Sequence, residues 1–312
     1  MSYSLAARLA NLYLRWRVKP RRGAPFDAAR ARARLENLTP KKKRVVPSDI
    51  LRVPVNADPE RGMPAGEWLQ PKAFTRTVLY LHGGGYFCCS PETHRRVCVR
   101  IARRARTQVY SVDYRLAPEH PFPAAVEDAV SAYALVLASG VAPAKLVIAG
   151  DSAGGGLALA CLLLARERGF PLPAGAVLFS PWTDLTLAGE SMRSMAERDA
   201  MFRPEQFPGV VAAYLAGRSA TDPLASPLFG DLHGLPPLAI WASVHEVLSS
   251  DAVRLHETAL AQGVKSELHL EPRLPHVWPI MVDLPEAKAA LAQAAEFIVN
   301  RTRTPDAARK AE

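Results

Sequence analysis

The chain has 312 residues, of which 49% are hydrophobic and 22% charged, so it is long enough to bury a core and too apolar to be mainly disordered. Its four cysteines show neither metal-site spacing nor a secretory disulfide framework, and we expect a reducing compartment, the cytoplasm. The formal net charge is +9, but residues 1–44 carry 13 basic and only 2 acidic residues, which argues against a uniformly basic nucleic-acid-binding protein.

This basic N-terminal segment is predicted to begin with an amphipathic helix. Leu5, Leu9, Leu12 and Trp16 recur at helical spacing, and we expect this apolar stripe to cover another surface of the protein. The basic residues form either a solvated helix face or a weak contact with an anionic surface such as a membrane. Arg8 interrupts the apolar stretch, so a signal peptide is not expected, and no apolar run later in the chain is long enough to span a membrane.

Short β-prone segments alternate with helical stretches along the rest of the chain. The predicted strands are Arg44–Val55, Gly66–Gln70, Thr77–Leu81, Gln108–Val112, Leu146–Ala149, Ala176–Phe179, Leu238–Ala242 and Glu267–Leu270. The predicted helices between and after them are Arg95–Ala105, Ala124–Ala138, Leu157–Arg168, Asp251–Ala261 and Glu286–Asn300. The first two strands resemble a hairpin. The later alternation predicts an α/β fold with a mostly parallel sheet, covered by helices on both faces, that binds ligands beyond the carboxyl ends of its strands.

One connection is much longer than the others. It spans residues 181–237 and contains a helix-like stretch at residues 204–216, and long insertions at a strand's carboxyl end are usually functional. We interpret it as a lid that the N-terminal helix joins. The predicted organisation is therefore an N-terminal cap segment (1–44), a catalytic core (45–180 and 221–312) and a cap insertion (181–220).

A candidate nucleophile follows the strand that ends at Ala149. Gly150 to Gly154 read G-D-S-A-G and lead directly into a helical run, so Ser152 lies on a strand-to-helix turn. Small neighbours allow the chain to bend sharply there and expose the hydroxyl at a helix N-terminus, where developing negative charge is favoured. A phosphate-binding loop is the alternative, but the Lys and Thr or Ser of a P-loop do not follow.

A second glycine-rich loop, residues 82–85 (H-G-G-G), follows the strand that ends at Leu81. Such a loop can be a simple flexible turn, but its place upstream of the serine matches the oxyanion hole of this class of nucleophile. We expect the backbone amides of Gly84, Gly85 and Ala153 to form that hole.

The general base is expected near the C-terminal end of the chain, after the acid. Among eight histidines, only His276 lies in a loop just past the last predicted strand. Glu246 and Asp251 are both candidates for the acid that holds its imidazole. Glu246 is favoured because it lies close to the carboxyl end of a strand, whereas Asp251 has the context of a helix N-cap.

Five segments together resemble the hormone-sensitive-lipase-like branch of the α/β-hydrolase superfamily. They are HGGGYF (82–87), DYRLAPE (113–119), GDSAGGG (150–156), DPLASP (222–227) and PHVW (275–278), and the resemblance extends over roughly residues 45–300. It implies an eight-stranded mostly parallel sheet with a helical cap, ester hydrolysis without a cofactor or metal, and an oxyanion hole at Gly84 and Gly85. Many relatives carry Asp where this chain has Glu246.

The predicted function is that of a serine carboxylesterase acting through an acyl-enzyme on small esters or lactones with short to medium acyl chains. Two alternatives remain: a non-catalytic small-molecule receptor on the same fold, and an amidase or lactonase using the same residues. The expected partner is the small ester, and no nucleic acid is expected. A homodimer is left open.

Overall fold

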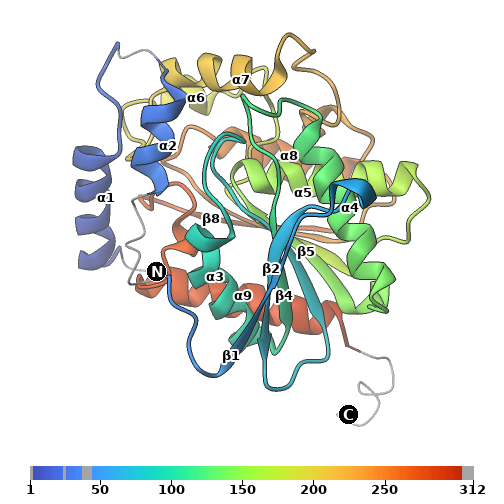
Figure 1. Cartoon of the computed structure of the whole chain (residues 1–312). Coiled ribbons are helices and arrows are strands. Elements are labelled where there is room, and N and C mark those ends of the chain that lie inside the picture. The colour runs from blue at the N-terminus through green and yellow to red at the C-terminus, as the bar shows by residue number, and fades with distance from the viewer. Residues whose placement is uncertain (1–2, 24–25, 37–43, 304–312) are drawn as a thin grey trace.

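The computed structural model describes residues 3–23, 26–36 and 44–303. At its centre is one eight-stranded sheet with the order β1-β2-β4-β3-β5-β6-β7-β8 (Figure 1). The strands are β1 (Ile50–Val55), β2 (Ala65–Pro71), β3 (Thr77–Leu81), β4 (Gln108–Asp113), β5 (Leu146–Asp151), β6 (Gly175–Phe179), β7 (Leu238–Ser243) and β8 (Ser266–Glu271). β1 pairs with β2 and β2 with β4 in antiparallel register, and all other neighbours are parallel. The predicted hairpin and the mostly parallel sheet are confirmed.

Helices cover the sheet on both faces, which explains why its central strands are apolar throughout. The covering helices are α3 (Pro91–Ala105), α4 (Ala124–Ala138), α5 (Ala153–Glu167), α8 (Ser249–Ala261) and α9 (Pro285–Arg301). Side chains of β3 alternate between two cores: Val78 and Tyr80 pack with α3 and α9, whereas Leu79 and Leu81 pack with α4, α5 and α8. The sheet is therefore a rigid layer that fixes where each strand ends.

Two helices begin four residues earlier than their apolar pattern predicts. In α3, Pro91 occupies the first turn, and the backbone N–H of Ser90 donates to the Thr93 hydroxyl at 3.0 Å. In α5, the glycines 154–156 are helical, although glycine is a poor helix former. Glycine is needed in this turn because a side chain has no space: a Cβ on Gly156 would lie 2.1 Å from the Trp182 carbonyl oxygen.

Four further helices gather at one end of the molecule as a cap (Figure 1). They are α1 (Leu5–Arg17) and α2 (Ala28–Glu36) from the N-terminal segment, and α6 (Ser191–Ser194) and α7 (Phe207–Leu215) from the long insertion. Arg32 of α2 pairs with both carboxylate oxygens of Glu119, at 2.8 and 2.9 Å, and thereby fastens the cap to the core.

The expectation that the apolar stripe of α1 covers another surface is wrong. Leu5, Leu9, Leu12 and Trp16 are exposed, and the helix buries Ala7 and Leu14 instead. Periodicity shows that a helix has an apolar face, but the hydrogen bonds that α1 makes with the cap insertion determine which face is turned inward.

A core substitution in α5 tests this packing. Leu157 is fully buried between α5 and the sheet, so Leu157→Ala is expected to lower the free energy of unfolding by about 2–5 kcal/mol. The matched control is Leu260→Ala in α8, whose side chain is 52% exposed and whose loss is expected to cost under about 0.5 kcal/mol. Urea denaturation measures both, and equal losses would contradict the proposed packing.

Candidate active site

Ser152 lies on a strained turn between β5 and α5. Its backbone has φ 52° and ψ −123°, a combination that residues other than glycine rarely adopt. The turn is possible because its neighbours are glycines: a Cβ on Gly154 would lie 2.1 Å from the Leu81 carbonyl oxygen, and one on Gly150 would lie 2.2 Å from the Gly154 carbonyl oxygen. The serine hydroxyl is thereby held at the first turn of α5.

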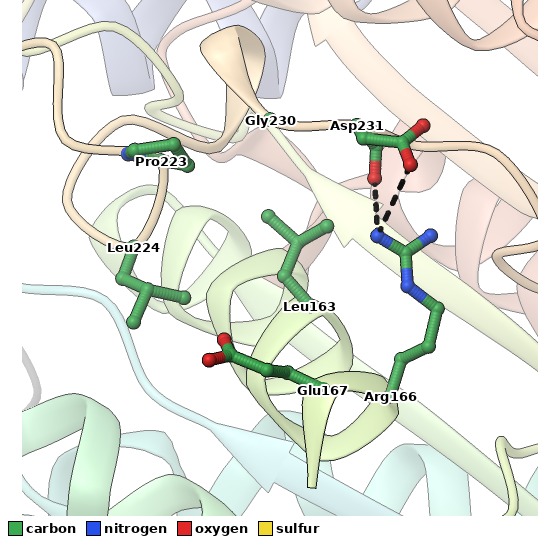
Figure 2. Close-up of a pocket in the computed structure, with 7 residues that line it drawn as sticks. All are labelled: Leu163, Arg166, Glu167, Pro223, Leu224, Gly230 and Asp231. Carbon is green, nitrogen blue, oxygen red and sulfur yellow. Dashed lines mark hydrogen bonds and ion pairs between the residues drawn. The ribbon is translucent and has the colours of Figure 1, made fainter. Parts of the chain in front are cut away.

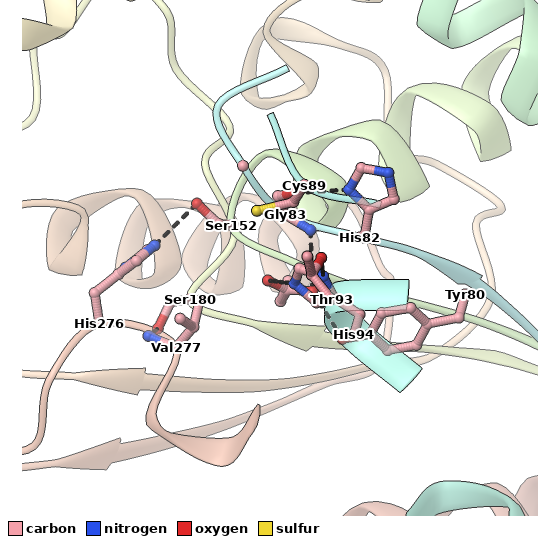
Figure 3. Close-up of polar contacts among 12 residues, drawn as sticks. Tyr80, His82, Gly83, Cys89, Thr93, His94, Ser152, Ser180, His276 and Val277 are labelled. Carbon is pink, nitrogen blue, oxygen red and sulfur yellow. Dashed lines mark hydrogen bonds and ion pairs between the residues drawn. The ribbon is translucent and has the colours of Figure 1, made fainter. Parts of the chain in front are cut away.

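The structure brings the three side chains of the candidate triad together. His276 Nε2 lies 2.9 Å from Ser152 Oγ (Figure 3), and His276 Nδ1 lies 2.7 Å from Glu246 Oε2. A carboxylate only accepts, so His276 donates from Nδ1 and leaves Nε2 free to accept the serine proton. The other oxygen of Glu246 accepts the Ser243 N–H at 3.0 Å, which orients the carboxylate toward the imidazole.

Asp251, the other candidate acid, lies elsewhere. It is in the first turn of α8 rather than at its N-cap, and its Oδ2 accepts the N–H groups of Thr183 and Asp184 at 2.8 and 2.9 Å. Burial raises the pKa of this carboxyl to about 7. Its contacts hold the start of the cap insertion, and none of them reaches His276.

The surroundings of His276 favour its protonated form. Burial alone would lower the pKa of this imidazole, but the adjacent Glu246 carboxylate outweighs burial and raises the pKa above the ordinary 6.5. The ring of Phe202, from the cap, packs edge-on against the imidazole with 4.9 Å between ring centres. The cap therefore covers one side of the base.

The glycine loop after β3 faces the same turn. Gly84 and Gly85 have φ values of 122° and 60°, and a Cβ on Gly84 would lie 2.1 Å from the Cys88 carbonyl oxygen. Both positions therefore require glycine. Within the described part of the chain, the backbone amides of Gly84, Gly85 and Ala153 donate to no other protein group, so they remain available to a ligand.

Proteins named as hydrolases and esterases are similar in sequence to this chain. A family described as alpha/beta hydrolase fold matches residues 78–280. An acetyl-hydrolase of Streptomyces hygroscopicus is 41% identical over 92% of this chain and 91% of its own length. An esterase of Acinetobacter venetianus is 38% identical over 74% of this chain and 78% of its own length.

Solved structures of similar proteins have the same fold as this chain. An esterase from the bacterial hormone-sensitive lipase family superposes with a TM-score of 0.88, at 38% identity, covering 97% of this chain and all of its own. The esterase EstE5 superposes with a TM-score of 0.89, at 39% identity, over 96% of this chain and 99% of its own. The chain belongs to the hormone-sensitive-lipase-like esterases of the α/β-hydrolase superfamily. It is a carboxylic ester hydrolase, as the motifs predicted.

One part of this esterase site was not anticipated from the sequence. Asp151, next to the nucleophile, is fully buried, and its carboxylate accepts the Tyr80 hydroxyl at 2.7 Å and the Gly83 N–H at 3.1 Å. Its other oxygen lies 3.3 Å from Nε2 of His94 on α3. The carboxylate therefore ties the serine turn to the glycine loop.

Charge stabilises this buried link. Burial alone would lower the pKa of His94, but the Asp151 carboxylate more than offsets burial and raises the pKa to about 9. His82, in the glycine loop, behaves in the opposite way, because burial and the positive charge of His94 lower its pKa to about 3. At neutral pH the cluster thus holds one ion pair and one neutral histidine. The role of His94 was not predictable from the sequence, because a histidine on a predicted helix carries no sign of its partner.

The larger of the two pockets described is remote from these residues. It measures about 460 Å³ and lies between the C-terminal half of α5 and residues 223–231 (Figure 2). Arg166 on its rim already donates to the carbonyl oxygens of Asp231 and His233. Among the described residues there is no metal-binding group of three or more acidic, His or Cys side chains, and no helix is long and apolar enough to cross a bilayer.

The pH dependence of kcat/KM tests the pairing of His276 with Glu246. The base works only when neutral, so activity is expected to rise with pH through a pKa above 6.5. In Glu246→Gln the largest charge that opposes burial is gone and only the smaller effects of Asp199 and Asp151 remain, so this rise should move to lower pH while turnover falls by roughly two to four orders of magnitude. Steady-state rates on a soluble ester over a pH series measure both effects.

Asp251→Ala provides the control. Two buried N–H groups lose their acceptor, so we expect a loss of about 1–3 kcal/mol in unfolding free energy, and the pH at which activity rises should not move. If Asp251→Ala shifted the rise and Glu246→Gln did not, the assignment of the acid would be reversed.

Proposed function

We propose that this esterase acts through an acyl-enzyme formed on Ser152, with His276 as general base and acid and Glu246 as the carboxylate that holds the imidazole. The observation that carries the proposal is the continuous line of hydrogen bonds from Glu246 through His276 to the Ser152 hydroxyl. A line of this kind activates a hydroxyl that is otherwise a weak nucleophile at neutral pH.

Acylation begins when Ser152 Oγ attacks the ester carbonyl carbon and its proton passes to His276 Nε2. The tetrahedral intermediate collapses as the bond to the alkoxy oxygen breaks, and that oxygen takes the proton from His276 and leaves as the alcohol. A water molecule then repeats the attack on the acyl-serine, with His276 again as base, and releases the carboxylic acid and the free hydroxyl. The Glu246 carboxylate stabilises the imidazolium formed in each half.

The amides of Gly84, Gly85 and Ala153 form the proposed oxyanion hole. Support comes from their position beside the serine turn and from their lack of another acceptor in the described structure. Removal of one such donor typically costs about 2.7–4 kcal/mol in the transition state. Asp151 serves as a positioning residue here, because it holds the Gly83 amide and thereby the start of the glycine loop.

Small esters and lactones with short to medium acyl chains are the proposed substrates. An aromatic wall lies over the base: Phe202 packs against His276, and Phe207 packs between Phe202 and Trp182, with ring centres 5.6 and 5.2 Å away. These rings fill space that a long acyl chain would need. An amidase would use the same residues, whereas a receptor would have no use for the base that contacts Ser152.

The division into domains follows the same proposal, with residues 1–44 and 181–220 as the cap and residues 45–180 and 221–312 as the core. It is supported by bonds between the two cap segments, because Lys19 donates to the carbonyl oxygens of Ala196 and Asp199 at 2.9 and 2.8 Å. We place the protein in the cytoplasm, which its free cysteines support. The homodimer stays a prediction.

Covalent labelling tests the nucleophile. A fluorophosphonate probe is expected to modify the full-length protein at Ser152, located by peptide mass mapping, because the probe reacts with a serine activated by a base. Ser152→Ala should abolish labelling and ester hydrolysis, whereas Ser194→Ala, at an exposed cap serine, should change neither. A protein that folds but remains unlabelled would favour the receptor alternative.

Acyl-chain preference tests the substrate class. With p-nitrophenyl esters, kcat/KM is expected to be greatest for acetate to octanoate and about tenfold or more lower for palmitate, because the aromatic wall excludes the longer chain. Phe202→Ala should shift the preference toward longer chains. Rates that rise steadily to long-chain triglyceride emulsions, or an anilide cleaved faster than any ester, would refute this substrate class.

A further inference from the structure

Helix α1 presents an apolar stripe to solvent. Leu5, Leu9, Leu12 and Trp16 follow one another at spacings of four, three and four residues, and they are 70%, 57%, 63% and 78% exposed. Single exposed apolar residues are ordinary, but a continuous row of four with a tryptophan at its end marks an interaction surface. We call these four residues the α1 stripe.

The helix is held firmly in this orientation. On its inner side Leu14 and Val18 pack against Ala200 and Met201 of the cap insertion. The guanidinium of Arg15 donates to the carbonyl oxygen of Glu197 at 3.0 Å, and Lys19 bonds the adjacent stretch of the cap. The exposure of the stripe is therefore built into the fold, because the contacts on the other side of the helix fix the direction in which it faces.

A basic pocket lies next to the stripe. It measures about 390 Å³ and is lined by Arg8 and Arg15 of α1, by Arg198 of the cap and by Arg273 after β8. Leu12 belongs to both the pocket and the stripe, so the two are continuous. Arg15 already donates to the carbonyl oxygens of Glu197 and Arg198, so it contributes mainly charge, whereas guanidinium groups such as those of Arg8 and Arg273 are suited to bind a phosphate through charge and paired hydrogen bonds.

The pKa of His245 reflects the positive charge around this pocket. Burial lowers the pKa of its imidazole, and the guanidinium groups of Arg198, Arg273 and Arg15 lower it further. The charged groups that act on this lining residue are thus all positive. A monovalent or divalent anion entering the pocket would relieve their mutual repulsion.

The charge around the stripe favours a lipid surface over a second copy of the chain. Residues 3–22 contain six basic and no acidic residues, and the Arg17 guanidinium lies 5.1 Å from the centre of the Trp16 ring. Glu197 compensates Arg22, but two copies that paired through their stripes would still bring Arg8, Arg15 and Arg17 of both copies together. A membrane with anionic headgroups compensates them and accepts leucine and tryptophan at its interface.

We propose that α1 docks the enzyme onto an anionic phospholipid surface, with the α1 stripe at the boundary of headgroups and acyl chains and one lipid phosphate in the arginine pocket. This interaction goes beyond ester hydrolysis and does not depend on the chemistry at Ser152. It identifies the face of the cap on which the enzyme would meet lipid.

The test uses the full-length protein and vesicles of phosphatidylcholine with or without phosphatidylglycerol. Sedimentation is expected to show at least about tenfold tighter binding to the phosphatidylglycerol vesicles, and added salt should weaken it. Trp16 emission should shift to shorter wavelength on binding, because Trp16 is 78% exposed, whereas Trp182, Trp241 and Trp278 are buried and Trp68 is partly buried. Ser152→Ala should bind equally well, so a failed esterase assignment and a failed docking proposal would be told apart.

Two pairs of variants distinguish the stripe from the pocket. Leu9→Ser with Trp16→Ser should lower vesicle affinity at least about tenfold, whereas Leu260→Ser, at an exposed leucine of α8, should not. Arg8→Gln with Arg273→Gln should remove the preference for phosphatidylglycerol, whereas Arg104→Gln, at an exposed arginine of α3, should retain it. Thermal melting checks that each variant folds, and Trp16→Phe should keep binding even if the double serine variant melts early.

Several results would overturn the proposal. One is equal binding to both kinds of vesicle, and another is loss of binding in the control variants to the same extent. Occupation of the pocket by inorganic phosphate without any vesicle binding would assign it to a free anion. A dimer that the stripe variant dissociates would assign the stripe to a second copy, and binding to a short RNA in place of vesicles would assign the basic face to nucleic acid.

Discussion

The site depends on one buried carboxylate. Asp151 stands between the nucleophile and the loop opposite it, and it bonds the Tyr80 hydroxyl, the Gly83 amide and the His94 imidazole at once. A buried charge is costly unless it is paired and fully hydrogen-bonded, and here three different elements supply the partners. The same bonds that satisfy the charge fix the distance between the serine turn and the glycine loop. The glycine loop cannot move away without breaking the Gly83 bond, and the serine turn cannot move away without separating Asp151 from His94.

Around this link, the backbone conformation fixes most of the geometry of the site. The Ser152 turn is strained, and it persists because the glycines beside it press against the carbonyl oxygens of Leu81 and of the turn itself. The parallel sheet supplies the rest, because β3, β5 and β7 all end on the same side and bring the glycine loop, Ser152 and Glu246 to one edge of the sheet. His276 arrives from the loop that follows β8, and its imidazole completes the line of hydrogen bonds.

The sequence predicted those parts whose signals are local. Apolar runs separated by amphipathic stretches indicated a parallel sheet, and the serine, histidine and acid were found from their places after strands. The link between Asp151 and His94 was not predictable in this way. His94 lies 57 residues before Asp151, and the two meet only because of how α3 packs against the sheet. The direction of α1 was missed for a related reason: its period indicates an apolar face, while hydrogen bonds to the cap decide which face is buried. Nor did Asp199 give any signal in the sequence.

Asp199 has a consequence for how the cap behaves. One oxygen of its buried carboxylate accepts the N–H groups of Met201 and Phe202, and the other accepts that of Val247, the residue after Glu246. One carboxylate therefore holds both the cap residues over the base and the loop that carries Glu246. A movement of residues 199–202 away from the core would break the bond to Val247, next to Glu246, so this part of the cap and the acid loop are coupled mechanically.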